Sequence, residues 1–210
     1  GMGASFIDGN LYRKPTFKVT EFEALGTGGL YLSDKEKAIV GNMGTGTTLV
    51  MASPGEITHI GGSAVGGGTL VGLSSRMFGV TDVKIISAMA SKGNLQNVDI
   101  SMSEISREKV PSLPDYATAS NFGKMKSTAT DNDVALGLLN MIYQTAGTLA
   151  VFACRNLGIN DVVMTGSLAT LKNARVLLGH VGELYGVNFI IPKKAAFATA
   201  VGAARLGASL

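Results

Sequence analysis

The sequence predicts an α/β fold. In the last third of the 210-residue chain, strand-like apolar runs alternate with helix-like runs, which is typical of an α/β unit. Ahead of this region, three short β-type runs separated by tight turns indicate a β-rich unit. Hydrophobic residues make up 46% of the chain and charged residues 16%, which excludes a disordered chain and allows a sizeable core.

The N-terminal half begins with two short predicted elements. Residues 17–19 indicate a strand, and residues 23–32 a helix that three glycines, at 26, 28 and 29, each weaken by roughly 1 kcal/mol relative to alanine. The β-rich unit then has its strands at Ala38–Met43, 47–52 and 57–60, with a hairpin turn at 53–55. We expect residues 1–35 to form a small N-terminal piece and residues 36–210 to form one α/β lobe.

Beyond the β-rich unit, two helices and an irregular stretch precede the regular last third of the chain. Helices are predicted at 70–78 and 83–91, the second capped by Thr81 or Asp82. Residues 95–130 are polar and irregular, and Pro111 and Pro114 interrupt them. The alternating last third comprises a helix at 133–157, a strand at 161–164, a helix at 171–185, a strand at 187–191 and a helix at 197–206.

Two glycine-rich loops, at 44–48 and 61–69, bracket the second strand. Such loops supply backbone N–H groups and hydroxyls without bulk, as an anionic or polyhydroxyl ligand requires. The second loop opens a helix, where free N–H groups and the positive end of the helix dipole favour phosphate. Neither a P-loop motif nor a Gly-x-Gly-x-x-Gly opening a helix is present. The pair of loops therefore predicts nucleotide binding by another device.

Composition limits the partners and the compartment. Eighteen Lys and Arg residues oppose 15 Asp and Glu residues without a basic cluster or basic-aromatic stripe, so nucleic acid is not an expected partner. The single cysteine, Cys154, allows no disulfide within the chain and no Cys/His metal cluster, so no metal-ligating residue is predicted. The first residues lack a signal peptide, which together with the reduced cysteine predicts a cytoplasmic protein. Residues 134–154 carry no charge, but their polar side chains favour a buried helix over a membrane span.

The order of the motifs resembles a known family. The first loop resembles the phosphate hairpin of the actin-like ATPase superfamily, and Thr165-Gly166-Ser167 resembles its adenosine motif. The chain is similar over nearly its whole length to type II pantothenate kinases. The matching segments are TEFEA at 20–24, NMGTGTT at 42–48, IGGSAVGGGT at 60–69, MASKG at 89–93, SNFG at 120–123 and FATAVGA at 197–203.

The resemblance implies a fold, a reaction and site residues. It implies an actin-like, ribonuclease H-like α/β lobe, a homodimer built on the helix at 133–157, and the conversion of ATP and pantothenate to ADP and 4′-phosphopantothenate with Mg²⁺, the first step of coenzyme A biosynthesis. The implied base is Glu21, with Glu23 as the neighbouring candidate. The implied ATP-binding residues are Gly66, Gly67, Gly68, Thr69, Gly166 and Ser167, and the implied acceptor-binding residues are Thr45, Thr48, His59 and Gly62.

Two departures from the family keep other functions open. No Asp-x-Gly-x-Thr hairpin precedes residue 21, so we expect residues 1–35 to be the remnant of a first lobe in a truncated kinase or in a non-catalytic nucleotide-binding protein. His59 stands where the family commonly has arginine, which leaves a different hydroxy-acid or pantetheine-like acceptor open. Activator ATPases of radical dehydratases share the fold, but they need cysteines for an iron–sulfur cluster, and one cysteine argues against that reading.

Overall fold

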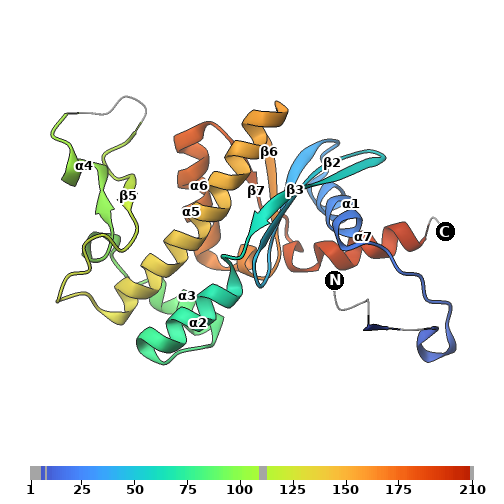
Figure 1. Cartoon of the computed structure of the whole chain (residues 1–210), viewed down its shortest axis with the longest axis horizontal. Coiled ribbons are helices and arrows are strands. Elements are labelled where there is room, and N and C mark those ends of the chain that lie inside the picture. The colour runs from blue at the N-terminus through green and yellow to red at the C-terminus, as the bar shows by residue number, and fades with distance from the viewer. Residues whose placement is uncertain (1–5, 8, 109–112, 209–210) are drawn as a thin grey trace.

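The computed structural model describes residues 6–7, 9–108 and 113–208 (Figure 1). The helices are α1 (Glu21–Ser33), α2 (Gly67–Phe78), α3 (Val83–Ala90), α4 (Met102–Ile105), α5 (Asp131–Leu157), α6 (Lys172–Tyr185) and α7 (Ala198–Gly207). The strands are β1 (Ala38–Met43), β2 (Thr47–Ser53), β3 (Glu56–Ser63), β4 (Ile100–Ser101), β5 (Thr118–Ser120), β6 (Asp161–Thr165) and β7 (Asn188–Ile190). Short 3₁₀ turns lie at η2 (Leu11–Arg13), η3 (Leu95–Asn97), η4 (Leu168–Thr170) and η5 (Ala195–Phe197).

The main sheet has five strands in the order β3-β2-β1-β6-β7. The first three strands form an antiparallel meander, in which Val40 pairs with Val50, and β6 runs parallel to β1 on its other side. Helix α5 lies across one face of the sheet and α1 across the other, while α7 packs on the outer side of α1 (Figure 1). The α/β prediction is confirmed, and the strands at 38–43, 47–52, 57–60 and 161–164 are found within a few residues of their predicted bounds.

Alternation along the strands produces two cores. Ile39 and Met43 of β1 point to the larger core beneath α5, whereas Ala38 and Val40 point to a smaller core that α1 closes. The sheet is therefore buried on both faces through most of its width.

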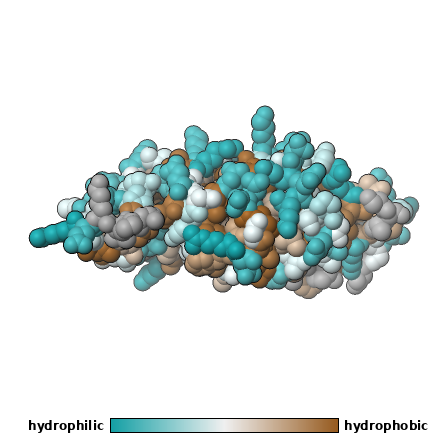
Figure 2. Space-filling model, turned by 90° about the horizontal axis from the view of Figure 1, so that it is seen from above, coloured by the Kyte–Doolittle hydropathy of each residue, from teal (hydrophilic) through white to brown (hydrophobic). Residues whose placement is uncertain are grey.

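Helix α5 supplies many of the buried residues of the larger core. Thr130 caps its first turn, and Gly158 ends it in a left-handed conformation (φ 63°). Among the described residues, α5 is the one helix long and apolar enough to cross a membrane, but 67% of that apolar window is buried inside the protein, against α3, α6 and the sheet. The buried-helix prediction fits this packing. On the face shown in Figure 2, hydrophilic and hydrophobic residues are interspersed.

Two predictions about local structure are wrong. Residues 17–19 do not form a strand, because the segment finds no partner strand and Phe17 is 60% exposed. The region 95–130 is not merely irregular, since β4 and β5 form a two-stranded antiparallel sheet beside α5. The buried Asp99 carboxylate organises it by accepting hydrogen bonds from the Phe122 N–H and the Asn140 amide. Pro111 lies outside the described residues.

Candidate active site

The glycine-rich loops meet at one edge of the main sheet. The parallel strands β1 and β6 both end there, and open α/β sheets commonly bind ligands beyond the carboxyl ends of their strands. Residues 44–46 form the tight turn that joins β1 to β2, because Met43 and Thr47 are still paired on either side of it. This turn is the centre of the candidate site.

The triple glycine clamps the turn. The Gly67 N–H donates to the Gly44 carbonyl at 2.8 Å, and the Gly68 N–H donates to the Thr45 carbonyl at 2.9 Å. The Gly66 N–H donates to the Thr69 hydroxyl at 3.2 Å. Of the four residues that the resemblance implied for ATP phosphate, three, Gly66, Gly67 and Gly68, thus have their N–H groups engaged within the protein.

The turn itself presents N–H groups outward. Among the described residues, neither the Thr45 N–H nor the Gly46 N–H donates a hydrogen bond, and Thr45 is exposed. The clamp requires glycine, since a Cβ on Gly66 would lie 2.7 Å from the Gly46 Cα and a Cβ on Gly67 would lie 2.8 Å from the Gly44 oxygen. The arrangement provides a rigid loop with unpaired donors, which suits an anion.

The end of β6 closes the same edge. Gly166 has a positive φ of 90°, and a Cβ there would lie 2.6 Å from Asn42 Oδ1, so this glycine packs directly on the end of β1. Its N–H donates to the Ala195 carbonyl at 3.0 Å. Ser167 follows at the start of η4, which the buried Tyr143 hydroxyl anchors by donating to the Leu168 carbonyl at 2.6 Å. Gly166 and Ser167 therefore lie beside the clamped turn.

The two candidate carboxylates have different surroundings. Glu23 takes part in the cap of α1: its N–H donates to the Thr20 hydroxyl, and its carboxylate accepts from that hydroxyl at 2.6 Å. Glu21 has no such role. Its Oε2 atom is buried and has no hydrogen-bond partner.

Glu21 borders a cavity of about 470 Å³ between the segment before α1, α1 itself and α7. No other carboxylate lines it among the described residues. The polar lining residues are Thr16, Lys18, Thr20, Glu21 and Thr199. Ala196, which also lines the cavity, follows the residue that accepts the Gly166 N–H, so η5 connects this cavity to the end of β6.

The residues predicted to bind the acceptor lie on β2 and β3. Thr48 pairs with Gly62 close to the turn, and His59 pairs with Val50 beyond a bulge in β3. Val50 belongs to the core that α1 closes, so alternation places Thr48 and His59 on that same face of the sheet. The His59 ring is stacked on Phe22 of α1, with centroids 4.2 Å apart and planes 8° apart. Reading the sequence missed Phe22 and η5. The former follows Glu21 in a matched motif, whereas no pattern singled out Ala195.

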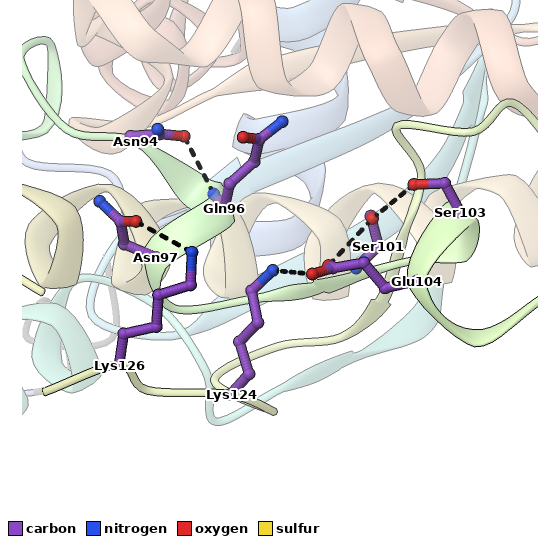
Figure 3. Close-up of polar contacts among 8 residues, drawn as sticks. All are labelled: Asn94, Gln96, Asn97, Ser101, Ser103, Glu104, Lys124 and Lys126. Atoms are coloured by element: carbon purple, nitrogen blue, oxygen red, sulfur yellow. Dashed lines mark hydrogen bonds and ion pairs between the residues drawn. The ribbon is translucent and has the colours of Figure 1, made fainter. Parts of the chain in front are cut away.

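Lys124, which lies just after the SNFG segment, is held elsewhere. Its ammonium group pairs with Glu104, and Lys126 reaches Asn97 nearby (Figure 3). The hydrogen bond from Lys124, followed by that from the Ser101 N–H, lowers the pKa of the Glu104 carboxyl to about 2. This cluster tethers the small sheet to its loop.

Strand order and direction, with the clamped turn and the Gly166 contact at one edge, define an actin-like ATPase fold. A solved structure of the activator of the 2-hydroxyisocaproyl-CoA dehydratase from Clostridium difficile with bound ADPNP superposes on this chain with a TM-score of 0.58 and 15% identity, covering 89% of this chain and 65% of the activator. The Fumble family model matches residues 31–178, and the chain belongs to this family of type II pantothenate kinases.

Curated relatives agree with that family. A type II pantothenate kinase of Staphylococcus aureus is 29% identical over 200 residues, and one of Staphylococcus epidermidis is 28% identical over 196 residues. A third, from Bacillus cereus, is 28% identical over 176 residues. The chain spans 74%, 72% and 63% of these three relatives, respectively.

Proposed function

We propose that the protein transfers the γ-phosphoryl group of ATP to the 4′-hydroxyl of pantothenate, the first step of coenzyme A biosynthesis. The observation that carries this proposal is the buried, unpartnered Oε2 of Glu21 beside a cavity that η5 links to the end of β6. A buried carboxylate oxygen left without a hydrogen-bond partner costs free energy in a folded protein, and such a group is a candidate for chemistry. Membership of the Fumble family supports the choice of substrates.

The loops divide the handling of ATP between them. The outward N–H groups of Thr45 and Gly46 hold the phosphates of ATP, since they are the donors left unpaired at the turn. Residues 66–69 contribute to phosphate binding indirectly, because they hold the turn at 44–46 in place. Gly166 and Ser167 border the adenosine side.

Glu21 acts as the base. Its carboxylate accepts the hydroxyl proton of pantothenate as the hydroxyl oxygen forms a bond to the γ-phosphorus. The bond between that phosphorus and the β–γ bridging oxygen breaks, and ADP leaves with the electron pair. The proton on Glu21 then passes to water. In our proposal the acceptor approaches the sheet face that carries Thr48 and Gly62 and the turn that carries Thr45.

The described residues contain no group of three or more His, Cys, Asp and Glu side chains that could hold a metal. Mg²⁺ commonly keeps several waters and binds through substrate phosphates with one or two carboxylates. In our proposal Mg²⁺ therefore arrives with ATP, and we route no step through it. We also propose a cytoplasmic homodimer that pairs through α5.

The alternative acceptor is a pantetheine-like alcohol or another small hydroxy acid. His59, stacked on Phe22, cannot form the bidentate hydrogen bonds with which arginine binds a carboxylate. ADP release with pantothenate, pantetheine and other hydroxy acids separates these acceptors. Turnover with pantetheine alone would replace the first proposal. Binding of ADP without turnover of any acceptor would identify a nucleotide-binding protein without kinase activity.

Glu21→Gln tests the base. We expect kcat to fall by about 10²–10⁴ while ADP binding is unchanged. Glu23→Gln is the matched control, because it alters the hydrogen bond to the Thr20 hydroxyl but not the lining of the cavity. It should retain kcat and lose stability by about 1 kcal/mol. Equal losses of kcat in the two variants would contradict the assignment.

A further inference from the structure

Helix α1 lies on the sheet through one stripe and on α7 through another. Phe22 contacts His59, and a Cβ on Gly26 would lie 2.7 Å from the side chain of Ile57. These residues are four apart on α1, and their partners are two apart on β3, so both contacts lie on the same helix face and the same sheet face. Gly29 continues the stripe against Val40 of β1.

Glu21 lies on the other stripe. It shares a face with Ala24 and Gly28, which are three and seven residues further along the helix and contact α7. Successive helical residues are about 100° apart around the axis. If the first turn rotated about the helix axis, the Glu21 side chain would rotate with it and would point to a different part of the cavity.

The stack is the sheet contact nearest to Glu21. Gly26 and Gly29 fix the middle of α1, because a glycine allows the helix backbone to lie directly on Ile57 and Val40. The Thr20 cap is local to the helix, and Ala24 rests against α7 at Gly202, so the contact that ties the first turn to the sheet is the Phe22–His59 stack. The bulge in β3 between His59 and Gly61 sets the position from which the imidazole meets Phe22.

We propose that His59 is a positioning residue: its ring, stacked on Phe22, fixes the first turn of α1 and thereby the direction of the Glu21 carboxylate. The inference rests on the proposed function for its kinetic consequence. It gives His59 a role that needs an aromatic ring and neither of its nitrogens. It also differs from acceptor binding, which was the role that the sequence suggested for this residue.

The kinetic test compares two substitutions at one position. His59→Ala should lower kcat by about 10- to 100-fold, as expected when a catalytic group is misplaced, with the KM for pantothenate changed by less than about threefold. His59→Phe should restore kcat, because phenylalanine keeps the stack. Thr58→Ala, at the neighbouring exposed position of β3, controls for disturbance of the edge strand. A raised KM in His59→Ala with no rescue by His59→Phe would overturn the inference in favour of direct acceptor binding.

A second measurement does not depend on turnover. Hydrogen exchange of peptides covering residues 20–31 reports the first turn, where the Ala24 N–H donates to the Thr20 carbonyl at 3.0 Å. Exchange should be faster in Phe22→Ala and His59→Ala, no faster in the double variant than in either single one, and normal in His59→Phe. Unchanged exchange in His59→Ala would overturn the inference. Failure of the wild type to phosphorylate pantothenate would instead contradict the proposed function and leave this exchange test decisive for His59.

Discussion

Gly28 of α1 faces Gly202 of α7 where the two helices cross. A Cβ on Gly202 would lie 2.7 Å from the Gly28 nitrogen, and a Cβ on Gly28 would lie 3.0 Å from the Gly202 nitrogen. The neighbours on both sides are helix backbone, which cannot turn aside as a flexible side chain can. Because Glu21 lies on the same stripe as Gly28, this crossing also sets how closely α7 approaches the Glu21 side chain.

A methyl group at this crossing should therefore separate the helices. We expect Gly28→Ala and Gly202→Ala each to lower the free energy of unfolding by about 3 kcal/mol or more, measured by denaturant titration. Gly179→Ala in α6 is the control, since a Cβ there meets nothing within 4 Å. It should be neutral or stabilise the protein by up to about 1 kcal/mol. A stable Gly28→Ala variant would contradict the close crossing.

The contact between the triple glycine and the turn at 44–46 can be tested within one helix. Gly67→Ala would press a Cβ against the Gly44 carbonyl oxygen and displace the turn, so we expect the Kd for ADP to rise by about tenfold or more. Gly72→Ala lies in the same helix but has open space around it. That variant should bind ADP as the wild type does, by calorimetry, and an equal loss in both would rule out a specific role for the clamp.

The sequence predicted much of the fold because hydrophobic alternation and glycine-bounded turns are local signals. The bounds of Ala38–Met43 are found as predicted, since this strand is apolar on both faces and ends at a glycine turn. Residues 17–19 show the limit of such signals. Their composition suits a strand, but pairing depends on whether another strand lies alongside.

The glycines of α1 show why the site was harder to predict. Propensity counts Gly26, Gly28 and Gly29 as a cost to the helix, whereas the fold uses them as contact points with β3, α7 and β1. Likewise, the resemblance implied residues 66–69 for ATP phosphate, and in the structure the N–H groups of Gly67 and Gly68 bond to the carbonyls of the first loop. Which donors remain free depends on tertiary contacts that no single segment encodes.

The Cys154 thiol should be unreactive towards alkylating reagents in the folded protein. Its side chain is 2% exposed, and burial, together with the charge of Asp161, raises the pKa of the thiol to about 11. Because the thiolate is the reactive form, iodoacetamide should leave Cys154 unmodified at neutral pH and alkylate it fully in guanidinium chloride, as followed by mass spectrometry. Rapid alkylation of the native protein would show that α5 opens readily.

Asp133 should make the stability depend on pH in the acid range. Hydrogen bonds from the Thr130 N–H, above all, and then from the Asn94 N–H lower the pKa of its carboxyl from 3.8 to about 2 against the opposing effect of burial. A carboxyl whose pKa is lower in the folded state stabilises the protein above its unfolded pKa of about 4, and that stabilisation is lost as the pH falls through about 2. The shift corresponds to a free energy on the order of 2 kcal/mol.

Asp133→Asn should therefore be less stable than the wild type at pH 7, and the difference in stability should narrow towards pH 2. Asp131→Asn is the control, since Asp131 is exposed in the same helical turn, and it should differ little in stability from the wild type. A constant gap between wild type and Asp133→Asn across this range in thermal melts would contradict the assignment.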